Sequence, residues 1–92
     1  MPEFLIERIM PGVAQLSVDD LKQTSRVGMA TLREQFPEIR WQRSYATDDI
    51  LYCVYEAPSE QMIREYARGS TLPVHKITEV RVTLDPTTVA EA

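Results

Sequence analysis

His75, the only histidine of the chain, and Glu79, four residues after it, are the residues best suited to hold a metal ion. Neutral imidazole binds nickel, copper and zinc, and a carboxylate can complete such a ligand set. His75 lies on a loop that enters the last expected strand, so its side chain could swing toward Glu79. The alternative is an ordinary surface histidine, because one imidazole per chain is poor for a tight site. A dimer would supply two imidazoles if the two loops meet.

A second set of residues could bind a cation or a polar ligand with carboxylates and hydroxyls: Glu7, Tyr45, Tyr52 and Glu56. All four are expected in strands, where they would point into a pocket between subunits. The alternative is structural. Glu7 would then form an ion pair with Arg81 or Arg43, and the tyrosines would serve for packing.

Cys53, the single cysteine, is expected in the middle of a central strand, with its side chain toward the helices. There it would be a buried, unreactive thiol, because a catalytic thiolate needs a histidine base beside it. The sequence contains no Ser-His-Asp arrangement, no phosphate-binding glycine loop and no paired CxxC motif. Nothing in the motifs therefore identifies a catalytic residue.

Alternation and helical periodicity divide the chain into six elements. Ser17 is a good N-cap, and the apolar residues that follow it at steps of three and four predict a long amphipathic helix. Gly28 inside this helix costs about 1 kcal/mol relative to alanine, and close approach to a strand is the expected compensation. The prediction is strands at 3–10, 39–46, 50–57 and 77–84, helices at 18–36 and 59–68, and a tail at 85–92.

The order β-α-β-β-α-β predicts an α+β, ferredoxin-like fold for the whole chain, residues 1–92, as one domain. Its sheet has four antiparallel strands in the order 4-1-3-2, with both helices on one face. In the second strand, Ile39, Trp41 and Tyr45 are expected on one side. The expected helix-covered face carries Phe4, Ile6, Leu51, Cys53, Tyr55, Val80, Val82 and Leu84. The expected opposite face carries Leu5, Glu7, Ile9, Tyr52, Val54, Glu56, Glu79 and Arg81.

The expected opposite face holds more apolar surface than a face exposed to water usually does. A second copy packed sheet on sheet would cover it, so a homodimer of the dimeric α+β barrel type is predicted.

Composition excludes several classes of protein. The 92 residues carry ten Lys and Arg against fourteen Asp and Glu, a net charge of −4, and the cations are scattered. Nucleic-acid binding requires clustered cations, so no nucleic-acid partner is expected. No apolar run of about 18 residues exists and the N-terminus lacks a signal-peptide pattern, so no membrane partner is expected. A lone cysteine fits the reducing cytoplasm.

Several segments together resemble a known family. They are Phe4-Leu5-Ile6-Glu7-Arg8 before Pro11-Gly12, Arg40-Trp41 with Arg43-Ser44-Tyr45, Tyr52-Cys53-Val54-Tyr55-Glu56-Ala57-Pro58 with Ile63-Arg64-Glu65, and Ile77-Thr78-Glu79-Val80 before Asp85-Pro86-Thr87-Thr88. They resemble a family of small bacterial ferredoxin-like domains of unknown function that includes a nickel-binding protein. The resemblance implies a ferredoxin-like subunit, a dimer and the capacity to bind nickel. It also implies a histidine where this chain has Tyr66.

Three functions follow as hypotheses. The first is a cytoplasmic homodimer that binds nickel, another divalent transition metal or a small ligand at the cleft between subunits. The second is a cofactor-independent enzyme of the dimeric α+β barrel type, similar to small monooxygenases or isomerases. The third is a non-catalytic interaction module.

Overall fold

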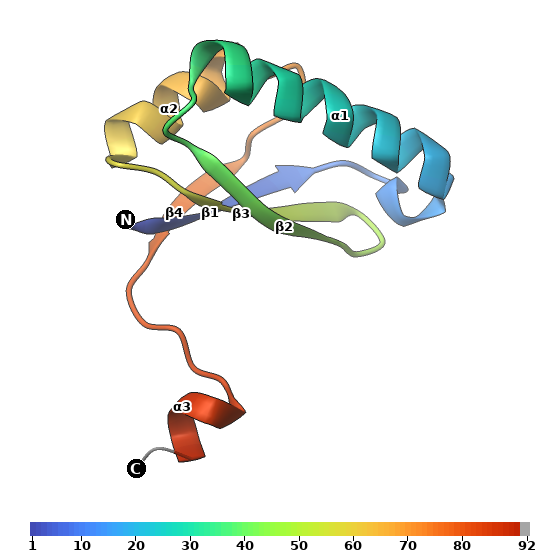
Figure 1. The fold of residues 1–92 in the computed structure, drawn as a ribbon. Helices are drawn as coiled ribbons and strands as arrows, with labels where there is room; N and C mark the ends of the chain where they lie inside the picture. Colours follow the sequence, from blue (N-terminus) through green and yellow to red (C-terminus); the bar gives the residue numbers. More distant parts are fainter. Residues whose placement is uncertain (91–92) are drawn as a thin grey trace.

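The computed structural model describes residues 1–90 and contains a four-stranded sheet covered on one face by two helices (Figure 1). The strand order is β2-β3-β1-β4, and every pairing is antiparallel. This is the ferredoxin-like arrangement that the sequence predicts, and the order of its main elements is confirmed. The elements are β1 (Glu3–Ile9), η1 (Val13–Gln15), α1 (Val18–Gln35), β2 (Arg40–Ala46), β3 (Ile50–Glu56), α2 (Glu60–Gly69), β4 (Lys76–Val80) and α3 (Pro86–Ala90).

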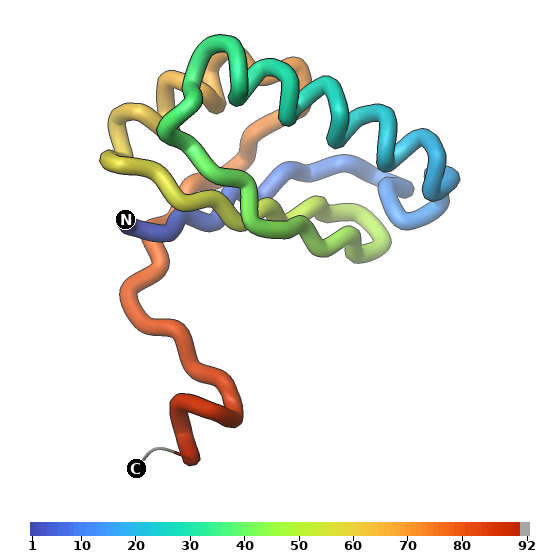
Figure 2. The backbone as a smooth tube through the Cα atoms, viewed as in Figure 1, coloured from blue at the N-terminus to red at the C-terminus, as the bar shows by residue number. Residues whose placement is uncertain are grey.

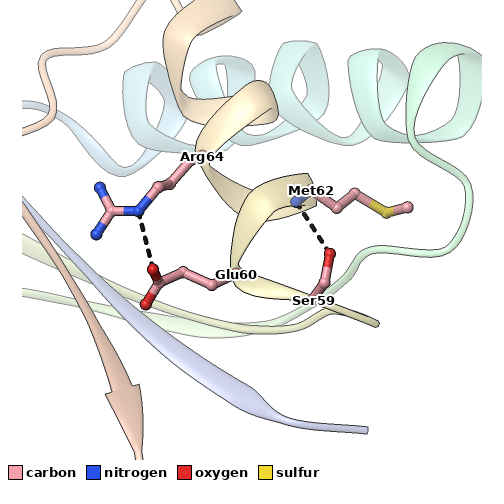
Figure 3. A network of polar contacts seen from close by, with 4 residues as sticks. All are labelled: Ser59, Glu60, Met62 and Arg64. Carbon is pink, nitrogen blue, oxygen red and sulfur yellow. Dashed lines mark hydrogen bonds and ion pairs between the residues drawn. The ribbon is translucent and has the colours of Figure 1, made fainter.

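Both long helices begin at the serine caps that the sequence indicates. The Oγ atom of Ser17 accepts a hydrogen bond from the backbone N–H of Asp20 at 3.0 Å. At the start of α2, the Oγ atom of Ser59 accepts one from the N–H of Met62 at 3.2 Å, and an ion pair joins Glu60 to Arg64 at 3.2 Å (Figure 3). Each cap satisfies a backbone donor that the first helical turn leaves free.

The core lies between the sheet and α2 with the C-terminal end of α1. In β1 and β3, Phe4 pairs with Tyr55 and Ile6 pairs with Cys53, and these side chains face the helices. Ile63 of α2 is fully buried against them. Cys53 is a free thiol in this core, so its predicted burial is confirmed.

The last strand is shorter than predicted, and its faces are reversed. β4 pairs with β1 only as far as Glu3, where β1 begins, so β4 ends at Val80. The predicted burial of Val82 and Leu84 is wrong, because both are 73 % exposed beyond the strand. The register also places Val80 opposite Glu3, on the uncovered face, and Glu79 opposite Phe4, on the helix-covered side.

The register of β2 against β3 is irregular between Trp41 and Arg43, so the strand contains a β-bulge. The bulge shifts the alternation by one residue. Trp41 pairs with Tyr55 and faces the helices, whereas Tyr45 pairs with Tyr52 and lies on the uncovered face. The prediction that Trp41 and Tyr45 share a side is therefore wrong.

Residues 81–90 leave the sheet and extend away from it, ending in the short helix α3 (Figure 2). All ten of these residues are exposed, among them the apolar Val82, Leu84 and Val89. Residues 91–92 of the expected tail lie outside the described residues. Among residues 1–90, no helix combines the length and the apolar character that crossing a membrane requires.

Candidate functional site

The predicted metal ligands His75 and Glu79 do not converge within one chain. His75 is exposed, and its backbone N–H donates to the carbonyl of Glu7 at 2.8 Å, which ties the start of β4 to β1. Four residues of extended chain separate the Cα atoms of His75 and Glu79 by about 13 Å. The carboxylate of Glu79 instead accepts a bond from Arg81 at 3.0 Å. Residues 1–90 contain no group of three or more His, Cys, Asp and Glu residues that could hold a metal ion.

Three of the four predicted ligand-binding residues lie side by side on the uncovered face. Glu7, Tyr52 and Tyr45 occupy paired positions on β1, β3 and β2, and Lys76 continues the row on β4. Glu56 is four residues from Tyr52, about 13 Å along the strand, where it pairs with Glu3 and with Arg40. The register thus brings Glu7, Tyr45 and Tyr52 together and leaves Glu56 at the other end.

On the opposite face of the sheet, a cavity of about 720 Å³ lies beneath α1. Four residues on one face of α1 form its roof: Leu21, Ser25, Gly28 and Leu32. Only Leu32, toward the C-terminal end of the helix, is buried. Below the roof, Leu51 is half-buried and Ala46 is exposed, although both face α1. The N-terminal half of α1 therefore covers the sheet without filling the space under it.

Gly28 of α1 also faces the unfilled space between the helix and the sheet. A Cβ atom added at Gly28 would meet no atom within 4 Å. The expected close approach to a strand is wrong, because at this position the helix faces the cavity.

One buried arginine, Arg8, lies in the cavity wall and is 1 % exposed. Its Nη1 atom donates to the Oγ atom of Ser70 at 3.3 Å and to the carbonyl oxygens of Leu72 and Pro73 at 3.4 Å. Its Nη2 atom donates to the hydroxyl of Tyr55 at 3.3 Å. All four distances exceed the usual range for N–H···O hydrogen bonds, about 2.7–3.2 Å.

A pair of buried phenols completes this cluster. The hydroxyls of Tyr55 and Tyr66 lie 3.3 Å apart, and their rings meet edge to face. Burial and the neighbouring Tyr66 raise the pKa of Tyr55 well above its ordinary value, so its hydroxyl is neutral. The phenols can therefore donate or accept hydrogen bonds, but they do not neutralise Arg8.

The positive charge of Arg8 has no anionic partner among residues 1–90. The ion pairs in this part of the chain are Arg64 with Glu60 and Arg81 with Glu79. Burial acts to lower the pKa of Arg8, but the contacts with Tyr55 and Cys53 outweigh it and the pKa lies above its ordinary value. The Nε atom of Arg8 is buried and has no hydrogen-bond partner within residues 1–90. A buried cation without a counterion is unusual, because buried charges are normally paired.

Sequence reasoning missed Arg8, although the alternation of β1 contained the signal. Side chains of a strand alternate between its two faces, and Arg8 is two residues after Ile6 and four after Phe4. It therefore lies on the helix-covered face with them. A charged residue at a position expected to be buried is the kind of exception that marks a functional site.

Comparison with known proteins identifies the family through a family model and supports the fold through a solved structure. The family model described as "Nickel responsive protein SCO4226-like" matches residues 4–80. The fold is similar to the crystal structure of SCO4226 from Streptomyces coelicolor A3(2), with a TM-score of 0.72 and 19 % sequence identity over 89 % of this chain and 99 % of that one. No curated protein matches the chain. Since the family model covers most of the sequence, this chain belongs to the SCO4226-like family of nickel responsive proteins.

Proposed function

We propose that this protein binds a small organic molecule in the cavity between α1 and the sheet. The observation that carries this proposal is the cavity of about 720 Å³, with a largely apolar wall and a group of buried polar side chains around Arg8. Ligand sites in proteins have this composition and volumes of roughly 300–1,000 Å³. The cavity is open to solvent at one side, where Val18 and Val27 are exposed, so a ligand can enter it without unfolding the chain.

Binding is proposed in preference to catalysis because the cavity wall formed by residues 1–90 contains no histidine, aspartate or glutamate. The wall includes the thiol of Cys53 and the phenols of Tyr55 and Tyr66, but His75 is not part of it. A thiol without an imidazole beside it is a weak nucleophile.

The single tryptophan, Trp41, lies in the cavity wall and provides the test. Decanoate and decanol are simple probes with an apolar body, and we expect at least one of them to change the emission of Trp41 with saturation. Gly28→Leu should abolish this response, because its side chain would project into the cavity. Gly28→Ala, the matched control, adds one methyl group and should retain it. No saturable response to either probe in the native protein would contradict the proposal.

A homodimer formed through the uncovered sheet face is a second part of the proposal. Ile9 and Tyr45 on this face are 46 % and 54 % exposed. The same face carries the carboxylates of Glu7 and Glu56 and the cations Lys76 and Arg40, so a second copy can offer opposite charges to each.

Sedimentation tests the dimer, with an expected mass of twice 10.6 kDa. Ile9→Glu should give monomers, because it replaces an exposed apolar side chain of the proposed interface by a charge. Val27→Glu is the matched control: Val27 is 52 % exposed on α1, and the variant should remain dimeric. Val54 is unsuitable for this purpose, since it is only 6 % exposed in the single chain. A native monomer at micromolar concentration would contradict the dimer.

Nickel binding between two copies is a second candidate function, favoured by the description of the family. Residues 1–90 of one chain contain no group of donors that fits a metal site, so the proposed ligands come from both copies, with His75 and Glu79 as the residues proposed. The proposed setting is the cytoplasm, where nickel would meet reduced thiols and neutral imidazoles.

Calorimetric titration of untagged protein with nickel tests this candidate. We expect one nickel ion per two chains, loss of binding in His75→Ala, and weaker binding at pH values that protonate imidazole. The monomeric Ile9→Glu variant should not bind. One ion bound per chain of that variant would exclude a site shared between copies.

A further inference from the structure

The cavity has a mainly apolar wall that nevertheless contains a buried charge. Its wall is mainly apolar and includes three cations. Lys22 and Arg26 are exposed, whereas Arg8 is buried and has no carboxylate within 4 Å among residues 1–90. A buried charge without a counterion is strongly unfavourable, and it is tolerated when an opposite charge completes the site.

The protein groups around Arg8 satisfy it poorly. Its four hydrogen bonds measure 3.3–3.4 Å, and its Nε atom makes none within the described residues. Guanidinium groups bind carboxylates through two parallel N–H donors at about 2.7–2.9 Å. A carboxylate in the cavity would therefore offer Arg8 shorter and stronger bonds than those of Ser70, Leu72 and Tyr55.

Neighbouring hydroxyls can add to such a contact. Tyr55, Tyr66 and Ser70 all line the cavity, and each hydroxyl can donate one hydrogen bond. A carboxylate accepts up to about four hydrogen bonds, so Arg8 and these hydroxyls could together satisfy it. The remaining wall, with Leu21, Leu51 and Trp41, suits an apolar body.

We infer that the natural ligand of the cavity is an organic acid with an apolar body, whose carboxylate binds Arg8. This inference rests on the proposed binding function and specifies the class of ligand. The alternative is that Arg8 is purely structural and ties the loop of residues 70–73 to β1 through its bonds to Ser70, Leu72 and Pro73.

The test compares three probes of equal chain length, decanoate, decanol and decylamine, by Trp41 fluorescence. We expect decanoate to bind at least about tenfold more tightly than decanol, and decylamine to bind weakest, because its charge repels that of Arg8. Arg8→Met should reduce the affinity for decanoate to that for decanol and leave decanol binding intact. Arg8→Lys keeps the charge and should restore part of the preference.

The outcomes distinguish failure of the inference about the ligand class from failure of the proposed binding function. Equal binding of decanoate and decanol would overturn the inference and leave the cavity as a ligand site. A preference for decanoate that persists in Arg8→Met would also overturn it, because another group would then recognise the anion. If no probe binds, the proposed function itself fails. Decanol binding by Arg8→Met shows in the same experiment that the variant is folded.

Discussion

The helix-covered face of the sheet has two halves that differ in packing. Under α2 and the C-terminal end of α1, Phe4, Ile6 and Ile63 are at most 1 % exposed. Under the N-terminal half of α1, Leu21 and Leu51 are only half-buried and border the cavity. Arg8 and Tyr55 lie where the two halves meet, since both line the cavity and Tyr55 belongs to the core.

This difference separates the residues that stabilise the fold from those available to a ligand. The packed half removes apolar surface from water and contacts it densely, which is the main source of stability in a small domain. The hollow half contributes less, and it retains space and a charge that a well-packed core would not contain.

The largest expected effect comes from truncating the same kind of side chain in each half. Ile63→Ala should lower the free energy of unfolding by about 2–5 kcal/mol, because it leaves a void among fully buried neighbours. Leu21→Ala should lower it by less than about 1 kcal/mol, because this side chain already borders open space. Urea denaturation measures both. Equal losses would mean that the hollow half is packed in solution.

The second expected effect is a loss of stability at high pH that depends on Tyr55. Its pKa in the folded chain lies above the ordinary value of 10.0, so above pH 10 the unfolded chain releases a proton that the folded chain keeps. Stability from this group is therefore complete below pH 10 and falls by about 1.4 kcal/mol for each further pH unit. Tyr55→Phe should flatten the alkaline slope in denaturation experiments. Tyr45→Phe, on the uncovered face, is the control, and an equal change in both variants would contradict the assignment.

The third expected effect has the opposite sign. Arg8→Met should raise the free energy of unfolding by about 1 kcal/mol, because an apolar side chain of similar length replaces a buried charge that has no counterion. Thermal denaturation of the ligand-free protein measures it. If Arg8 is instead a structural tie for residues 70–73, the variant should be several kcal/mol less stable than the native chain.

The sequence was sufficient to predict the fold because local patterns and topology agree in it. Serine caps mark both long helices, and the alternation of β1 and β3 identifies the central strands. The wrong predictions concern β4 and β2, where the pairing between strands, and not the alternation along one strand, decides the result. The end of β4 depends on where β1 begins, and the side on which Tyr45 lies depends on the bulge between Trp41 and Arg43.

The candidate site was harder to predict from the sequence than the fold was. Glu7, Tyr45 and Tyr52 do lie in one row, but the cavity depends on the height of α1 above the sheet, which no local pattern encodes. The position of Arg8 in the alternation of β1 did indicate that its side chain lies on the helix-covered face. Its lack of an anionic partner is not, because that depends on every element packed around it.

The smallest expected effect concerns the roof of the cavity. Gly28→Ala should raise the free energy of unfolding by about 0.5–1 kcal/mol, since alanine favours a helix interior and its methyl group would meet no atom. Urea denaturation at constant m-value measures the change. A decrease in stability would show that α1 lies closer to the sheet than the cavity implies.

The most direct test of carboxylate binding at Arg8 is a crystal structure of the protein with decanoate. We expect the decanoate chain to lie between α1 and the sheet, along Leu21 and Leu51, with its carboxylate within hydrogen-bond distance of the Arg8 guanidinium. Decanoate bound on the uncovered face, or bound in the cavity with its carboxylate turned away from Arg8, would contradict it.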